Sequence, residues 1–283
     1  MRDARSQVRR PIGLRLWLSG GWITLLIIGA VFAPLIAPHD PLYQDLFAGR
    51  MPPVWVDGAD PNFLLGTDSL GRDVLSRILY GARLALTVAL VAGTLTCLIG
   101  ATLGLIAGYY RGWVDMVISR LVDIWMAFPP VLFAILLIAV LGTGLTSIII
   151  AIVVIDWTRF ARVVRAEAMT QGTMDYVASA QVVGRTKAGT MFAEILPNVL
   201  PTIVALLTLE MGIAVIVEAI LSFVNLSIST DAPTWGGMIA EGRTSVHQAW
   251  WVLVFPLITL FLTVLSFSQL GEGLKDYFDP VLR

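Results

Sequence analysis

Two carboxylic acids, Glu210 and Glu218, lie inside one long apolar run of the sequence. A charge within such a run is costly and usually faces a water-filled path or a polar partner. The two residues are eight positions apart, about 80° around a helix, so they share roughly one face. They are candidates to line a pathway for a polar solute or for protons. The alternatives are a polar contact between helices or subunits, or a protonated carboxyl group.

Asp123 and Asp156 also interrupt apolar runs, and each lies three residues from an arginine. Residues three apart on a helix are neighbours. We therefore expect local ion pairs between Arg120 and Asp123 and between Asp156 and Arg159. Both pairs fall near the predicted cytoplasmic ends of their helices.

The residue inventory excludes several kinds of catalytic site. A phosphate-binding P-loop needs a glycine directly before its lysine, and neither Lys187 nor Lys275 follows a glycine. His39 and His247 are too far apart for a His-Glu-x-x-His zinc motif. The single cysteine, Cys97, excludes a multi-cysteine metal site and an internal disulfide, and its apolar surroundings predict a buried, inert thiol. We expect no enzymatic activity, no metal and no cofactor in this chain.

The composition predicts an integral membrane protein. Hydrophobic residues make up 57% of the 283 residues and charged residues only 14%, against about 25% charged in soluble domains. The net charge of −1 argues against a nucleic-acid partner. Long apolar stretches favour spanning helices over short barrel strands. We expect six spans in an all-α fold, at residues 22–37, 84–109, 117–141, 147–160, 200–226 and 250–270.

Positive charges predict the orientation of these spans. With the N-terminus in the cytoplasm, fourteen of the nineteen Lys and Arg residues fall inside, as the positive-inside rule requires. Both termini are then cytoplasmic. The chain is then organised in four parts. Residues 1–21 form a cytoplasmic N-terminal segment, and residues 22–83 form the first span with a long outer segment. Residues 84–270 form a core with a cytoplasmic loop at 161–199, and residues 271–283 form a cytoplasmic tail.

The cytoplasmic loop has clear local signals. Thr173 is a candidate N-cap, Asp175 favours a helix start, and Gly184 suits a left-handed helix end. A second helix, from about Thr186, is expected to stop before Pro197.

The first of these helices carries an apolar stripe, formed by Tyr176, Val177, Ala180 and Val183. A helix this short is marginal in water, so the stripe needs a partner. That partner is either the cytoplasmic ends of the chain's own spans or another protein.

The loop resembles the EAA loop of ABC-importer permeases. The matches at the family's spacing are Tyr176, Val177, Ala180, Gly184 and the run Ile195-Leu-Pro-Asn198. Three positions depart from the pattern. Ala178 replaces the glutamate that names the loop, Ser179 replaces an alanine, and Glu194 stands where the subfamily often has histidine. The resemblance implies that this loop contacts an ATPase subunit through Glu167, Asp175, Tyr176, Val177, Ala178, Ser179, Ala180, Gly184 and Pro197.

Four further stretches, in the same order as in the peptide and nickel subfamily, extend the resemblance to most of the chain. They are Leu65–Arg83, Arg120–Pro129, Glu218–Phe223 and Pro233–Arg243. The match is to the C-type permease of dipeptide, oligopeptide or nickel importers, which implies the type I importer fold and a bacterial inner-membrane location. It also implies a B-type permease partner, two cytoplasmic ATPases that bind the ATP, and an extracytoplasmic binding protein. Dipeptide, longer peptide, nickel chelate, glutathione and haem all remain open as solutes.

The outer segments offer two further candidates. Residues 70–83 are expected to form an amphipathic helix on the membrane surface, either as a docking surface or as a lid. Trp235 is a candidate to stack on a solute, and the alternative is an aromatic belt that it forms with Trp250 and Trp251.

Three other function classes are weighed against the permease. A proton-coupled secondary transporter would use Glu210, Glu218, Asp123 and Asp156 and would need no ATPase. An intramembrane enzyme would need a nucleophile–base pair or a metal cluster at membrane depth, and the sequence offers neither. A purely structural subunit would tolerate changes at residues 176–184.

Overall fold

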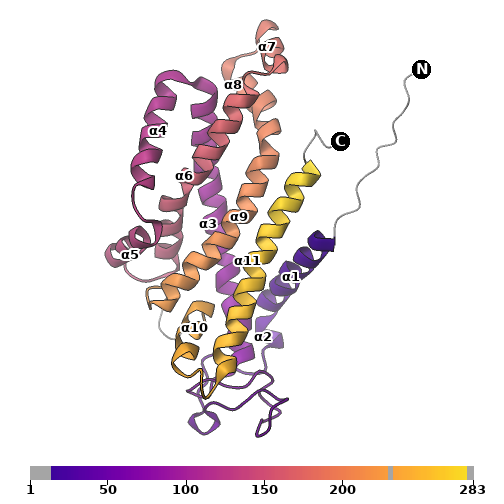
Figure 1. Ribbon diagram of the computed structural model, residues 1–283, viewed down its shortest axis with the longest axis vertical. Coiled ribbons are helices and arrows are strands. Elements are labelled where there is room, and N and C mark those ends of the chain that lie inside the picture. The colour runs from indigo at the N-terminus through magenta and orange to yellow at the C-terminus, as the bar shows by residue number, and fades with distance from the viewer. Residues whose placement is uncertain (1–13, 229–231, 279–283) are drawn as a thin grey trace, which may run out of the picture.

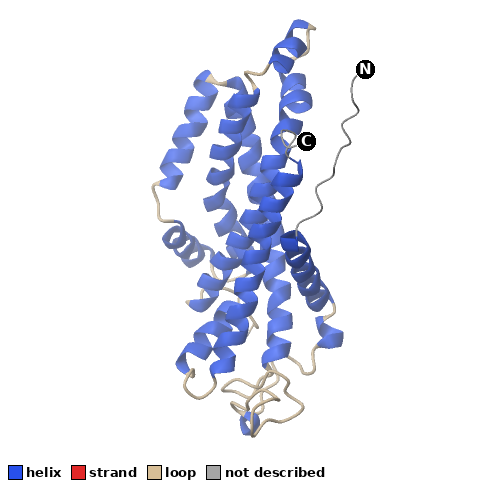
Figure 2. Cartoon of the chain, turned by 45° about the vertical axis from the view of Figure 1, so that its right-hand side comes forward, coloured by secondary structure: helices blue, strands red, loops and turns tan. Residues whose placement is uncertain are grey.

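The computed structural model describes residues 14–228 and 232–278, and this part of the chain contains helices and loops but no strand (Figure 2). The main helices are α1 (Leu14–Val31), α3 (Val74–Tyr110), α4 (Gly112–Met126), α5 (Pro130–Leu141), α6 (Leu145–Gln171), α9 (Leu196–Phe223) and α11 (Trp250–Phe278). Shorter elements are α2 (Ala33–Ile36), η1 (Leu46–Ala48), α7 (Asp175–Val182), α8 (Lys187–Thr190), the π-helical turn η2 (Met191–Ile195) and α10 (Trp235–Thr244).

Figure 1 places α7 at one end of the bundle and the irregular segment before α3 at the other. The C-terminal end of α11 points toward the end that carries α7. Helix α6 leads into α7, and α9 follows α7 after the short elements α8 and η2.

Four helical stretches are long and apolar enough to cross a membrane, namely Leu14–Val31, Val74–Tyr110, Lys187–Phe223 and Trp250–Lys275. Helix α6 does not meet that standard, since Asp156, Arg159 and Arg162 lie within it. The described residues therefore confirm an all-helical membrane protein without fixing the number of spans at six.

The predicted span at residues 117–141 is not one straight helix. Helices α4 and α5 are bent by 85° at the break between them. Pro129 lacks a backbone N–H and disfavours helical geometry at Phe128, so the helix ends there. Pro130 then occupies the first turn of α5, where a proline is tolerated.

The expected surface helix at residues 70–83 is also wrong. Helix α3 starts at Val74, capped by the Asp73 side chain, which accepts from the Ser76 backbone N–H at 2.8 Å. It then continues without a break for 37 residues, about 55 Å at the α-helical rise. The polar side that was expected to face water is buried inside the chain, with Arg77 only 1% exposed.

Helices α3 and α6 pack closely along three glycines. A Cβ added at Gly100, Gly104 or Gly108 would lie 2.3–2.6 Å from a carbonyl oxygen of α6. Small residues spaced four apart let two membrane helices approach to backbone contact. This spacing is visible in the sequence and predicts such a contact, but hydrophobicity alone does not detect it.

Candidate functional site

Helix α7 (Asp175–Val182) begins and ends close to the residues that its sequence indicates. Asp175 lies in its first turn, and Gly184 beyond its C-terminus adopts a φ of +88°. The predicted N-cap is wrong by one residue, because Met174 takes that position and no side chain caps the helix. The Thr173 hydroxyl instead donates to the Thr170 carbonyl at 2.7 Å.

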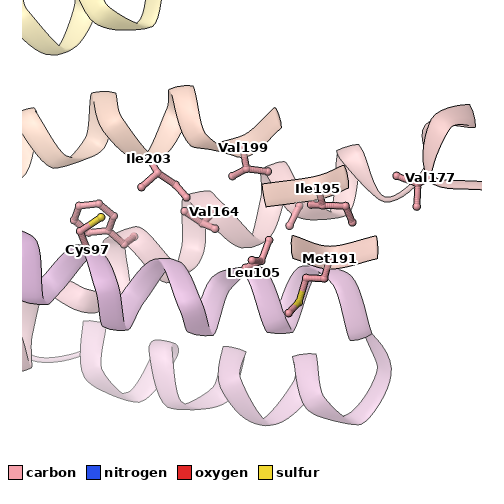
Figure 3. Close-up of a cluster of buried hydrophobic side chains, with 10 residues drawn as sticks. Cys97, Leu105, Val164, Val177, Met191, Ile195, Val199 and Ile203 are labelled. Carbon is pink, nitrogen blue, oxygen red and sulfur yellow. The ribbon is translucent and has the colours of Figure 1, made fainter. Parts of the chain in front are cut away.

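One face of α7 is anchored to the rest of the chain. Val177 is 1% exposed and belongs to an apolar cluster contributed by α3, α6, η2 and α9, which includes Leu105, Val164, Ile195 and Val199 (Figure 3). The stripe thus packs partly on the chain's own helices. Cys97 lies in the same cluster and is a buried free thiol, as expected.

A hydrogen-bond chain connects α7 to the end of α6. The Tyr176 hydroxyl donates to Gln171 Oε1 at 2.7 Å, and Gln171 Nε2 donates to Glu167 Oε1 at 2.9 Å. Burial, with the nearby Glu194 carboxylate, raises the pKa of the Tyr176 hydroxyl. The tyrosine therefore stays neutral and keeps its donor role at physiological pH.

The opposite face of α7 is open. Ala178 and Ser179 are exposed, and Val182 and Val183 are each 87% exposed. Val183 was expected on the apolar stripe with Val177, but as the C-cap of α7 it is not covered by the chain's own helices. Two exposed valines therefore lie together at the C-terminal end of α7.

The second helix of the loop does not stop before Pro197. The short helix α8 passes through the π-helical turn η2 directly into α9, with Pro197 in the first turn of α9. In that turn the Leu196 N–H donates to the Met191 carbonyl, five residues back. The wider turn accommodates a proline that a regular helix would exclude. The loop and α9 therefore form one continuous element.

The C-terminal half of α6 is connected to α4 by ion pairs. Arg165 pairs with both oxygens of Asp115, and Arg162 Nη2 lies 3.3 Å from Asp123 Oδ1. The predicted pair between Arg120 and Asp123 is therefore wrong, since the partner of Asp123 is a residue on the neighbouring helix. Spacing along one helix does not reveal such a contact.

A second ion-pair cluster joins α6 to α9. The expected pair of Asp156 and Arg159 is present at 3.7 Å, and Arg159 Nη1 also lies 3.4 Å from Glu210 Oε2. Glu210 is 1% exposed, and its other oxygen has no hydrogen-bond partner among the described residues. The inter-helix contact that was one of the alternatives for Glu210 is thus observed.

Glu218 is likewise buried, and it is bonded within its own neighbourhood. The hydroxyls of Ser222 and Ser227 donate to Glu218 Oε1 at 2.5 and 3.3 Å. These two hydrogen bonds connect the C-terminal end of α9 to Ser227 in the segment that follows it.

The end of the bundle opposite α7 contains a buried ionic network that sequence reasoning missed. Arg77 Nη1 lies 2.5 Å from Asp68 Oδ2 and 2.7 Å from Glu241 Oε2. Arg72 contacts the same two carboxylates, each at 2.7 Å. Burial alone would lower the pKa of Arg72, but Asp68 and Glu241 outweigh it and raise that pKa. The network fastens the outer segment and the start of α3 to α10.

Trp235 lies inside this fold. Its indole N–H donates to the Ile78 carbonyl at 3.1 Å, its ring packs against Gly81, and the residue is 1% exposed. Trp251 is similarly placed, with its N–H donating to the Thr67 carbonyl at 3.0 Å. Both tryptophans connect segments within the chain, and Trp235 offers no free ring face in this conformation.

The described residues form a helical membrane protein, and comparison with known families shows the class to which it belongs. Residues 100–283 match the model of the "Binding-protein-dependent transport system inner membrane component" family, and residues 16–53 match the "N-terminal TM domain of oligopeptide transport permease C". The chain belongs to the binding-protein-dependent transport family of inner membrane components.

Relatives narrow the subfamily. The chain is 38% identical over 262 residues to the di/tripeptide transport system permease protein DppC of Pseudomonas aeruginosa, covering 93% of this chain and 86% of the relative. It is 37% identical over 269 residues to the glutathione transport system permease protein GsiD of Pectobacterium atrosepticum, covering 94% and 86%.

A solved structure supports the fold alone. The crystal structure of an amino acid ABC transporter with histidines shares 18% identity with this chain, at a TM-score of 0.54 over 69% of this chain and 91% of that one. Together these comparisons confirm the resemblance to ABC-importer permeases. The alternative of a proton-coupled secondary transporter is therefore wrong. The chain is a component of a transport system and not an enzyme.

Proposed function

We propose that this chain is the C-type permease subunit of an ATP-driven importer for short peptides in the inner membrane of a bacterium. Relatives named for dipeptides, di/tripeptides and glutathione, at 37–38% identity along almost the whole chain, support a short peptide as the solute. The partners are a B-type permease, two cytoplasmic ATPases and an extracytoplasmic binding protein. ATP is bound by the ATPases, and this chain holds no cofactor.

The proposed topology has six spans and both termini in the cytoplasm. The spans are α1, α3, the bent pair of α4 and α5, α6, α9 and α11. Helix α6 crosses despite its charges, because Arg159 is paired with the buried carboxylates of Asp156 and Glu210. The distribution of Lys and Arg supports the orientation.

The observation that carries the mechanism is the two-sided character of α7. Its inner face is anchored through Val177 and Tyr176, and its outer face exposes Val182. Closure of the ATPases moves α7, and the packed cluster beneath it passes that movement to α6 and α9 as rigid elements. The pathway then opens alternately to the two sides of the membrane. Glu210 and Glu218 line or brace that pathway, and Trp235 braces its outer end.

Uptake by the reconstituted complex tests the proposed function. Proteoliposomes that contain both permeases and the ATPases, with the binding protein outside, are expected to accumulate a labelled dipeptide only when ATP is enclosed. A proton gradient without ATP is expected to drive none. Uphill uptake that depends on the proton gradient, or that proceeds with this chain alone, would contradict the proposal.

A further inference from the structure

A cavity of about 380 Å³ lies between the C-terminal end of α9 and helix α10, at the end of the bundle opposite α7. This volume is at the lower end of the roughly 300–1,000 Å³ that is typical of pockets for small molecules. Its described lining is strongly polar, which distinguishes it from the gaps between the apolar helices. Neither the coupling mechanism nor the comparisons give this cavity a role.

Two of the charged groups in the lining neutralise each other. Arg77 and Glu241 pair at 2.7 Å, and Asp68 and Arg72 complete the buried network behind them. This network contains two cations and two anions. It gives the cavity a rigid floor without net charge.

Arg243 is the third charged side chain of the described lining, beside the paired Arg77 and Glu241. It is exposed, and within the described part of the chain it has no carboxylate partner. Its Cζ atom lies 5.2 Å from the centre of the Phe223 ring, so a cation–π contact holds the side chain in place. That contact uses the face of the guanidinium group and leaves its N–H donors available. Arg243 is therefore the charged side chain of the described lining that no carboxylate of that lining neutralises, and it favours an anionic group beside it.

The serine hydroxyls of the lining favour a hydrogen-bond donor of the ligand, whereas Arg243 favours an anion. Ser222 and Ser227 each donate their single hydroxyl proton to Glu218. A hydroxyl whose proton is already used offers only its oxygen lone pairs to a ligand. These two positions therefore suit an N–H donor. Asn225, with an amide that both donates and accepts, lines the same cavity.

We propose that this cavity is a subsite for a short peptide with a free carboxylate. Arg243 binds the carboxylate, and the oxygens of Ser222 and Ser227 accept from N–H groups of the peptide. The inference rests on the proposed function and adds to it a place and a chemical requirement within this chain. Discrimination between a free acid and an amide then arises partly in the permease and not only in the binding protein.

The test compares two solutes in the reconstituted complex, alanyl-alanine and alanyl-alanine amide. Arg243→Gln removes the charge while it keeps hydrogen-bonding capacity. Arg83→Gln is the matched control, because Arg83 is also exposed and lies 5.8 Å from the ring of Tyr80 but does not line the cavity. The same binding protein is used throughout, so any change in the ratio of the two uptake rates arises in the permease.

We expect Arg243→Gln to lower uptake of alanyl-alanine about tenfold, as the loss of a charge-assisted hydrogen bond implies, and uptake of the amide less than twofold. Arg83→Gln leaves both rates unchanged. An equal fall for both solutes, or no fall for either, would overturn the subsite. If the unaltered complex takes up neither solute with ATP, the proposed function itself fails.

If the amide is not transported, a labelling experiment tests the subsite instead. Ala240→Cys places a thiol in the lining, and Cys97 is buried and will not compete for a membrane-impermeant reagent. Alanyl-alanine is expected to slow labelling of this thiol in the ATPase-inhibited complex with the binding protein present. Adding Arg243→Gln is expected to abolish that protection. Labelling that the peptide does not slow would contradict the proposal.

Discussion

Arg159 on α6 and Glu210 on α9 contact each other across the bundle, with Nη1 3.4 Å from Oε2. These are the two helices that flank the coupling loop, so the pair links them at a second point, away from the loop. Removing the arginine would leave a buried carboxylate without its cation, which costs about 3 kcal/mol or more. Arg159→Ala is expected to lower the midpoint of thermal unfolding of the purified complex clearly more than Glu210→Gln does. A larger loss for Glu210→Gln would contradict the pairing.

The glycine contact between α3 and α6 predicts a sharp size limit. A Cβ at Gly104 would lie 2.6 Å from the Ala161 carbonyl oxygen, where backbone has to move. Gly104→Ala is expected to cost about 1–3 kcal/mol and to reduce the yield of folded protein. Gly93→Ala is the control, because its Cβ would meet the flexible Met211 side chain at 3.2 Å. Equal yields of the two variants, measured by size-exclusion chromatography, would refute the close packing.

The outer ionic network predicts that Arg77 tolerates no neutral replacement. Arg77→Ala would leave Asp68 buried with one cation fewer, at a cost of about 3–5 kcal/mol. Arg77→Lys keeps the charge but loses the planar fork, so we expect an intermediate loss. The midpoint of thermal unfolding in detergent is measured for Arg77→Ala, Arg77→Lys and the unaltered chain. A stability of Arg77→Ala equal to that of the unaltered chain would show that the network does not hold the outer segment.

Removal of the Tyr176 hydroxyl is expected to have a small, local effect. Tyr176→Phe keeps the ring and removes the hydroxyl that donates to Gln171, which costs about 1 kcal/mol. We expect unchanged yield, faster hydrogen exchange in residues 175–182, and a reduced rate of uptake per ATP hydrolysed. Unchanged exchange in α7 would show that the hydrogen-bond chain does not fix its position.

Local signals in the sequence predict α7 well, because Asp175 and Gly184 act through the backbone of their own helix. The ion pairs that were missed share one cause, which is a partner distant in the sequence. Asp123 pairs with Arg162 rather than Arg120, and Glu241, the partner of Arg77, is 164 residues away. Hydrophobic patterning also assumes that polar residues face water, and this assumption fails where they form a buried network.

Two other features carried signals in the sequence that hydrophobicity does not use. The double proline at Pro129 and Pro130 predicts the bend between α4 and α5. The spacing of Gly100, Gly104 and Gly108 predicts the contact of α3 with α6. The cavity beside Arg243 had no such signal, since its lining comes from the end of α9, the segment that follows it, α10 and Arg77 of α3.

The most direct test of the account concerns Val182 on the open face of α7. Its side chain is 87% exposed in this chain, so Val182→Asp is expected to leave the fold and the thermal stability of the isolated permease pair unchanged. In the reconstituted importer the charge would fall within the contact with the ATPase, and we expect ATP-dependent peptide uptake to fall at least tenfold. Uptake by Val182→Asp at the rate of the unaltered importer would show that α7 does not couple the ATPases to transport.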